Sequence, residues 1–181
     1  GHETAFGHYQ GINNFYNGDE VAILNFDAHF DLRDLLPGDL GSSGTPFRQI
    51  HNLLRSQQQK FYYYCAGIQK QANTSSLFAY AAHNHVEYIT SEIINRNPYE
   101  LDWIEKIISK HRHLYVTICL DVFNAAVAPG VSAPQPLGIT PTYVLESLKL
   151  LKKSKKVLSL DIVEFAPKFD IQEHTAKLAG S

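Results

Sequence analysis

Methionine is missing altogether from this chain of 181 residues, and cysteine and tryptophan are rare, with two copies and one copy. The chain begins with Gly-His-Glu and not with an initiator. We therefore expect either a fragment of a longer protein or a sequence that lacks its methionines and an amino-terminal portion. Cys65 and Cys119 lie in separate apolar runs, and their spacing is typical of neither a disulfide framework nor a zinc site. This cysteine usage favours a reducing, cytoplasmic location.

Long apolar runs and an excess of one charge are missing as well. No apolar run approaches the roughly 20 residues that a membrane-spanning helix needs. Sixteen basic residues stand against 18 acidic ones, so the formal net charge is −2. This balance gives no electrostatic reason to expect a nucleic acid or an anionic membrane as partner. The 44% of hydrophobic residues are enough for a sizeable core, and we expect a single domain over residues 1–181.

Short apolar runs alternate with helical patterns along the chain. This alternation predicts a mainly parallel sheet covered by helices on both faces, which is a three-layer α/β/α fold. Such sheets bind ligands beyond the carboxyl ends of their strands. Two stretches rich in Gly, Pro and Ser, 38–44 and 128–138, closely follow predicted strands and are interpreted as loops of a site. Strands are expected at 21–26, 61–68, 86–89, 114–120 and 157–163, and helices at 46–58, 98–111 and 141–152.

The strongest functional signal is the segment NFDAHFD, in which Asp27, His29 and Asp31 follow an apolar strand at alternate positions. If the backbone stays extended, all three side chains lie on one side. Two carboxylates and an imidazole suit a divalent cation that accepts mixed oxygen and nitrogen ligands, such as manganese. Caps and turns are the usual role of such residues when they occur singly, but three in alternation favour a metal site.

Two further predicted strands end in acidic residues. Asp121 closes the strand 114–120, and a carboxylate there needs a partner or a cation. Cys119 lies two positions earlier and faces the same way, either as a further ligand or as a buried core thiol. In the last strand, Asp161 either reaches the same rim or accepts a structural hydrogen bond. Glu164 follows it and is suited to a cationic or amidine-like group.

Four blocks in this order resemble the arginase, agmatinase and formimidoylglutamase (ureohydrolase) superfamily. They are His2 in Gly-His-Glu, DAHFD at 27–31, Asp121 with the following APGVSAP, and DIVE at 161–164. The resemblance continues to the tail at 175–179 and implies an arginase-like fold. Because members of this family begin upstream of the Gly-His-Glu motif, the chain resembles the carboxyl-terminal two-thirds of one.

The resemblance implies two manganese ions per chain and places Glu164 at the amidino group of the substrate. The implied metal ligands are His2, Asp27, His29, Asp31, Cys119 and Asp121. Cys119 departs from the family pattern, because most members have Asp there, bridging both ions. A thiolate is softer than a carboxylate and suits manganese less well. We therefore expect the second ion to be held less tightly.

Within the superfamily, the segments NFDAHFDLRD, SSGTPFRQI and APGVSAP look most similar to formimidoylglutamase. Arginases have Asn at the position of Arg33 and a proton-shuttling His near the position of Ser43. A nearby arginine repels a guanidinium substrate, whereas formimidoylglutamate carries two carboxylates. Bidentate pairing with those carboxylates is the role expected for Arg33 and Arg48, with Ser43 beside them in the substrate site.

The implied reaction is the manganese-dependent hydrolysis of N-formimidoyl-L-glutamate to L-glutamate and formamide, in histidine degradation. A metal-activated hydroxide would attack the formimidoyl carbon, Asp31 would relay the proton, and Glu164 would orient the amidine. A guanidino hydrolase of the agmatinase or arginase type is an alternative that Arg33 disfavours. A metal-binding relative without turnover, acting as an interaction subunit, is another, and Cys119 points to it. The family also tends to form homo-oligomers.

Overall fold

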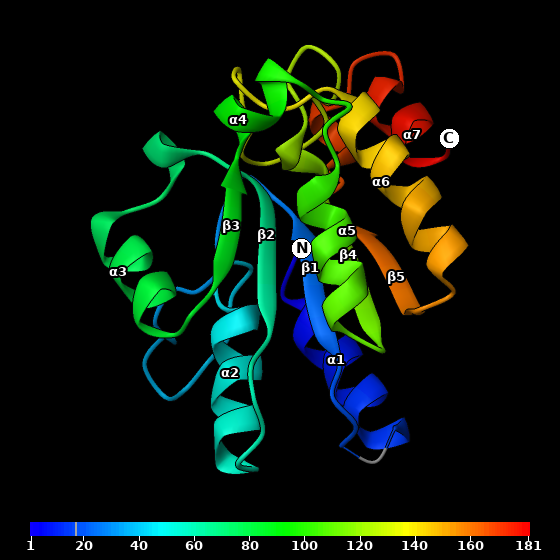
Figure 1. The fold of residues 1–181 in the computed structure, drawn as a ribbon. Coiled ribbons are helices and arrows are strands. Elements are labelled where there is room, and N and C mark those ends of the chain that lie inside the picture. Colours follow the sequence, from blue (N-terminus) through cyan, green and yellow to red (C-terminus); the bar gives the residue numbers. More distant parts are fainter. Residues whose placement is uncertain (17) are drawn as a thin grey trace.

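A computed structural model describes residues 1–16 and 18–181. Its centre is a parallel sheet with the strand order β3-β2-β1-β4-β5, which confirms the predicted α/β architecture (Figure 1). The strands are β1 (Ala22–Phe26), β2 (Tyr63–Ile68), β3 (Glu87–Thr90), β4 (Leu114–Cys119) and β5 (Val157–Val163). All five lie close to the apolar runs that predicted them.

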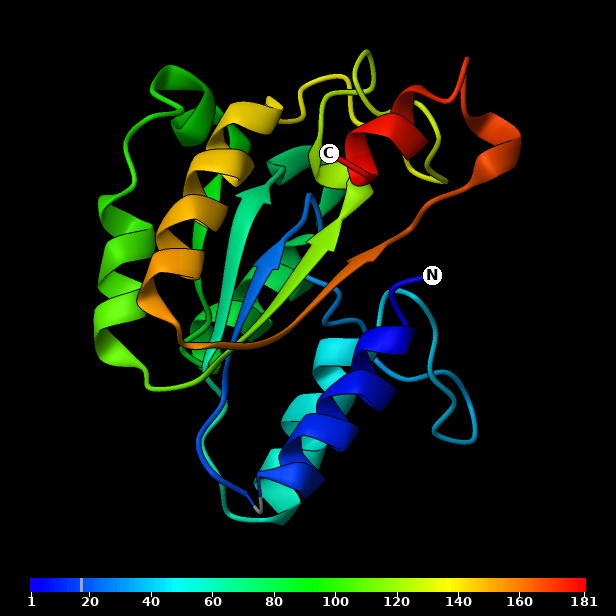
Figure 2. The same cartoon turned by 90° about the vertical axis from the view of Figure 1, so that its right-hand side faces the viewer.

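Helices cover both faces of this sheet. They are α1 (Thr4–Phe15), α2 (Pro46–Ser56), α3 (Ser75–His83), α4 (Ser91–Arg96), α5 (Asp102–Lys110), α6 (Pro141–Ser154) and α7 (His174–Ala179). Apolar side chains of α1, α2 and α3 pack in one hydrophobic cluster, and those of α4, α5 and α6 pack in another. Figure 2 shows the two layers on opposite sides of the strands, with α1 and α2 in blue and cyan and α5 and α6 in green and orange.

The strands β1, β2 and β4 are buried along their whole length, because helices lie on both of their faces. Alternate side chains enter opposite layers: Ile23 packs in the cluster of α1 and α2, and Leu24 packs in the cluster of α5 and α6. Burial of such a side chain stabilises the fold by about 1.5–3 kcal/mol. This explains why the strands read as continuous apolar runs and not as alternating ones.

The strand order reverses between β1 and β4. From β1 the chain continues to β2 and β3 on one side, and it then crosses to β4 and β5 on the other. Asn25 pairs in register with Thr117, and Phe26 pairs with Ile118. The residues that follow, at the carboxyl ends of both strands, therefore meet at the switch point, which is the usual ligand position in such sheets. The loops after β4 and β5 lie at the same end, at the top of Figure 1.

The outermost strand on the β4 side, β5, is less covered than the central strands. Leu160 and Ile162 are each 42% exposed, and Figure 2 shows β5 at the margin of the sheet, in orange. One side of β5 pairs with β4. The other side is the edge of the described sheet.

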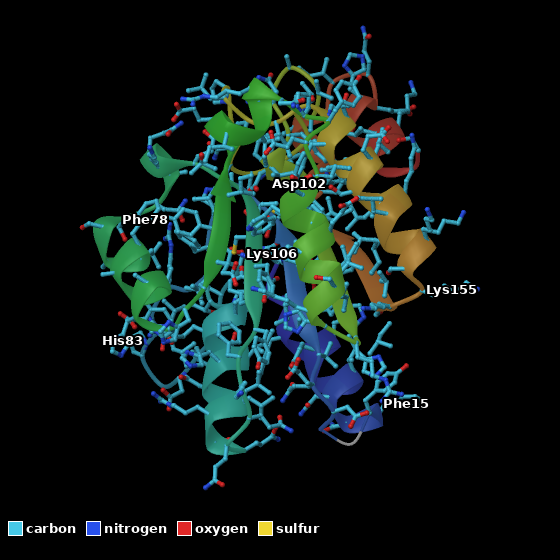
Figure 3. All side chains as sticks on the ribbon, in the orientation of Figure 1. Phe15, Phe78, His83, Asp102, Lys106 and Lys155 are labelled. Carbon is cyan, nitrogen blue, oxygen red and sulfur yellow. The ribbon has the colours of Figure 1, made fainter. Side chains whose placement is uncertain are left out.

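Several helices differ from the prediction. The helix expected over 98–111 begins only at Asp102, because Pro98 and Tyr99 form a turn and residues 100–101 are irregular. Asp102 and Lys106 lie on its outer side, and Lys155 lies beyond the end of α6 (Figure 3). The sequence reading missed α1, α3, α4 and α7. Within the described residues, no helix combines the length and apolar character that crossing a membrane requires.

Candidate metal centre and substrate cavity

The segment after β1 turns sharply, so the extended backbone expected over 27–31 is wrong. The backbone N–H of Asp27 still bonds to the carbonyl of Ala66 at 2.9 Å and continues the ladder to β2. Its Oδ1 then accepts from the backbone N–H of His29 at 2.7 Å, which bends the chain. Asp31 has a left-handed backbone with φ 49°. A turn, and not strand alternation, thus brings the three side chains to one place.

His2 reaches this place from the residues just before α1. Its Nδ1 lies 3.1 Å from Asp27 Oδ2 and 2.9 Å from Asp31 Oδ2, and the ring is buried. Its Nε2 lies 3.1 Å from Thr117 Oγ1 on β4, and the ring of Phe47 packs edge-on at a centroid distance of 5.1 Å. Thr117 and Phe47 therefore hold the imidazole so that Nδ1 faces the two carboxylates.

His29 occupies the other side of Asp27. Its Nδ1 lies 3.4 Å from Asp27 Oδ1 and 3.2 Å from Asp121 Oδ2. Asp121 comes from the short 3-10 turn Leu120–Val122 that follows β4. Asp27 thus contacts both His2 and His29, and the Asn25 side chain donates a hydrogen bond to Oδ2 of Asp27 at 3.1 Å.

The charges in this cluster depend strongly on one another. Burial by itself lowers the pKa values of His2 and His29. The adjacent carboxylates outweigh burial and raise these pKa values to about 10 for His2 and about 11 for His29. Burial raises the pKa of Asp27, and the two imidazoles outweigh it and hold that pKa below its usual range. Burial and the charge of Asp27 raise the pKa values of Asp31 and Asp121. Such excess negative charge in a buried site is stabilised by cations.

The donor set fits two divalent cations. One group of ligand atoms belongs to His2, Asp27 and Cys119 and the other to Asp27, His29 and Asp121, with the atoms of each group within 4.8 Å of one another. Asp121 Oδ1 is buried and makes no hydrogen bond within the described part of the chain, whereas His2 Nδ1 lies at ion-pair distance from Asp27 and Asp31. Buried polar atoms without partners are rare and need an explanation. Ions between the converging donors give one.

A cavity of about 340 Å³ opens beside this cluster. Its lining consists of His29, Asp31, Arg33, Ser42, Ser43, Gly44, Cys119, Asp121, Ser132, Ala133 and Glu164. Glu164 has a left-handed backbone, with φ 66°. Its Oε1 accepts from the backbone N–H of His2, and Ser132 Oγ donates to its Oε2 at 3.4 Å. Glu164 and Arg33 therefore place opposite charges around one small cavity.

Two residues considered from the sequence take other positions. Arg48 does not line this cavity: its Nε donates to the carbonyl of Leu32 at 3.1 Å and its guanidinium pairs with Asp34 at 3.0 Å and stacks on Tyr80. These contacts argue against the substrate-binding role predicted for Arg48. Asp161 accepts from Tyr115 and contacts His8 Nδ1, both at 2.6 Å. It is thus a structural acceptor that ties α1 to β5.

Sequence reasoning missed the residues that hold the cluster in place. Thr117 orients His2, and Asn25 donates to Asp27. Gln135 approaches His29 Nε2 at 3.4 Å from the loop 128–138. The loop was predicted from its composition, and alternation along the strand is the signal that could have placed Thr117 on the face of Cys119. Nothing in the sequence singled out Gln135.

Comparisons with known proteins identify the family of this chain. The model of the arginase family matches residues 1–181. The formimidoylglutamase of Legionella pneumophila (strain Lens) is 44% identical over 182 residues, which are 99% of this chain and 56% of that protein. The formimidoylglutamase of Clostridium tetani is 40% identical over 189 residues, with 99% and 55% covered. The chain thus spans little more than half the length of these curated relatives.

Solved structures show the same fold. The formimidoylglutamase of Bacillus subtilis superimposes with a TM-score of 0.84 at 25% identity, covering 98% of this chain and 55% of that one. The Trypanosoma cruzi formiminoglutamase, solved with Mn²⁺, superimposes with a TM-score of 0.86 at 20% identity, covering 99% and 59%. Because the family model matches the whole chain and relatives of 40–44% identity cover 99% of it, the chain belongs to the arginase family.

Proposed function

We propose that this chain is the catalytic domain of a manganese-dependent formimidoylglutamase, which hydrolyses N-formimidoyl-L-glutamate to L-glutamate and formamide in histidine degradation. One observation carries the proposal. Glu164 and Arg33 line the same cavity as the acidic and imidazole cluster. A carboxylate suits the amidine end of this substrate, and a guanidinium suits its carboxylates. The similarity to formimidoylglutamases supports the same substrate.

The proposed metal ligands are His2, Asp27, His29, Asp31, Cys119 and Asp121. When bound, two divalent metal ions, at least one of them Mn²⁺, supply the Lewis acidity that activates water and stabilises negative charge developing at the amidine. The Mn²⁺ in the Trypanosoma cruzi relative supports this choice of metal. The two converging ligand groups support the two positions, as does the buried Asp121 Oδ1, which makes no hydrogen bond within the described residues.

The side chains of the cavity then orient the substrate and move one proton. Glu164 accepts hydrogen bonds from the amidine nitrogens and turns the formimidoyl carbon toward the cluster. Arg33 binds a substrate carboxylate. As water adds to that carbon, Asp31 takes a proton and passes it to the glutamate nitrogen, which leaves as the carbon–nitrogen bond breaks. The products are formamide and glutamate.

A substrate comparison tests this proposal. The purified chain, loaded with Mn²⁺, is assayed for product release from N-formimidoyl-L-glutamate, agmatine and L-arginine. We expect the formimidoyl substrate to give the highest kcat/KM, because Arg33 repels a guanidinium. Asp27→Ala should lower turnover by at least roughly 100-fold, since Asp27 is shared by both ligand groups.

The same assay separates the alternatives. A higher kcat/KM with agmatine or arginine would identify a guanidino hydrolase and contradict the proposed substrate. Stoichiometric metal with no hydrolysis of any amidine would instead indicate a relative that binds metal and interacts with a partner. Full activity of Asp27→Ala would contradict the metal assignment itself.

A further inference from the structure

Cys119 stands at an unusual place for a buried thiol. It is the last residue of β4, is 1% exposed, and directly follows Ile118, which pairs with Phe26. Thr117, two residues earlier, contacts His2. Most buried cysteines pack as small apolar side chains. This one lines the cavity at the edge of the metal cluster.

Independent observations indicate that a ligand belongs at this thiol. A ring nitrogen of His2, a carboxylate oxygen of Asp27 and the Cys119 sulfur lie within 4.8 Å of one another. His2 Nδ1 is buried against the carboxylates of Asp27 and Asp31, and the other ring nitrogen contacts Thr117. Asp121 Oδ1, two residues after the thiol, is buried and makes no hydrogen bond within the described residues.

The two ligand groups differ in chemical softness. The thiol subsite, formed by His2, Asp27 and Cys119, offers nitrogen, oxygen and sulfur and is buried throughout. The carboxylate subsite, formed by Asp27, His29 and Asp121, offers only oxygen and nitrogen, and His29 is partly exposed. Thiolates select zinc-class ions, whereas carboxylates suit manganese. One centre thus contains two different metal preferences.

We propose that Cys119 is a thiolate ligand and that the thiol subsite selects Zn²⁺ or a similarly soft divalent ion over Mn²⁺, so that the loaded protein holds two different metals. The proposal rests on the metal-binding part of the proposed function. It assigns Mn²⁺ to the carboxylate subsite alone. Binding replaces the sulfur-bound proton with the metal, and this proton leaves to solvent.

Cobalt spectroscopy tests the ligand assignment directly. The metal-free chain is titrated anaerobically with Co²⁺, whose bond to sulfur gives a near-ultraviolet charge-transfer absorption. We expect this absorption in the unmodified chain and in Cys65→Ala, the matched control that removes the only other thiol. It should vanish in Cys119→Ser and Cys119→Asp. Circular dichroism checks that each variant is folded.

Competition between metals tests the selectivity. Zn²⁺ and Mn²⁺ are titrated calorimetrically into the chain and into Cys119→Asp. We expect the ratio of Zn²⁺ to Mn²⁺ affinity to fall at least about tenfold in the Asp variant, because the soft ligand is replaced by a hard one. An unchanged ratio would overturn the proposed selectivity, and Cys119→Ser gives a second reading if the Asp variant does not fold.

The outcomes distinguish this inference from the proposed function. Co²⁺ binding without the sulfur absorption overturns the role of Cys119 and leaves the hydrolase proposal intact. A sulfur absorption that persists in Cys119→Ser also overturns it. The absorption together with an inability to hydrolyse N-formimidoyl-L-glutamate supports the ligand and overturns the proposed activity. No binding of Co²⁺, Zn²⁺ or Mn²⁺ overturns both.

Discussion

Two arginines that are close in the sequence have different surroundings in the fold. Arg33 is exposed and lines the cavity beside the metal cluster. Arg48 is half-buried, paired with Asp34 and stacked on Tyr80, and so connects α2 to its neighbours. Because the two side chains are chemically identical, any difference in their roles must come from their surroundings. We expect Arg33 to contact the substrate and Arg48 to stabilise the fold.

Substitution of each arginine by alanine tests this separation. Arg33→Ala should raise the KM for N-formimidoyl-L-glutamate roughly 10- to 100-fold with little change in kcat, because a hydrogen bond to a charged group contributes about 1.5–3 kcal/mol. Arg48→Ala should lower Tm and leave KM unchanged, because it loses packing and a stacked ring. The reverse pattern in steady-state kinetics would reassign the carboxylate contact to Arg48.

The site residues were not equally predictable from the sequence. Asp27, His29 and Asp121 stand out because each directly follows an apolar strand. His2 is different, because a single histidine before a helix has no signal of its own, and it came only from the family resemblance. Its position depends on Thr117 and Phe47, which are far away in the sequence. The metal assignments remain predictions.

At the scale of elements, strands were easier to predict than helices. Burial on both faces leaves a continuous apolar run that marks each central strand. The pattern of α1 is weak, because Gly7, His8 and Gly11 interrupt it, and its packing on α2 and β1 stabilises it instead. The start of α5 was misplaced because Pro98 suggested a first turn that the chain forms at Asp102.

A glycine near the end of β2 makes the approach of two site loops possible. Gly67 has φ 107°, in a part of β2 where the register with β3 shifts. A Cβ atom there would lie 2.3 Å from Val122 Cγ2 and 3.2 Å from the carbonyl oxygen of Asp27. Asp27 is itself a proposed metal ligand and Val122 follows another, Asp121, so this glycine lets the strand ends come together.

Two glycine-to-alanine substitutions should have opposite effects on stability. Gly67→Ala should lower the free energy of unfolding by about 1–3 kcal/mol, because it combines a strained φ with a clash. Gly7→Ala should raise it by about 0.5–1 kcal/mol, since Gly7 lies inside α1 with no atom near its Cβ position. Urea unfolding measures both. If both substitutions changed the free energy of unfolding equally, the positive φ and close contacts of Gly67 would not restrict this position to glycine.

At the scale of the whole molecule, the buried carboxylates link metal binding to stability. An ion that binds the folded chain alone stabilises it by about 2.7 kcal/mol at a concentration 100 times its Kd. For a chain of this size we expect Mn²⁺ to raise Tm by roughly 5–10 °C and EDTA to reverse the rise. Differential scanning calorimetry measures the shift. Asp27→Ala should abolish it, and a persisting shift would place the ion elsewhere.

Because β5 is an edge strand of the described sheet, we predict that this chain self-associates. The outer side of β5 belongs to the edge of the described sheet, and Leu160 and Ile162 are both exposed. Exposed apolar edge strands pair readily with other chains. The double variant Leu160→Lys, Ile162→Lys should reduce the associated fraction in sedimentation velocity, with Leu145→Lys on α6 as the control. A monomeric unmodified chain at high concentration would contradict this role of β5.

The hydrogen bond from the backbone of His2 to Glu164 joins positions 162 residues apart. During synthesis His2 therefore emerges well before Glu164, its hydrogen-bond partner, has been made. Contacts this distant in sequence are among the last that a chain can close. During refolding, metal binding should therefore begin only when β5 has joined the sheet. The time course of metal binding then reports the final stage of folding.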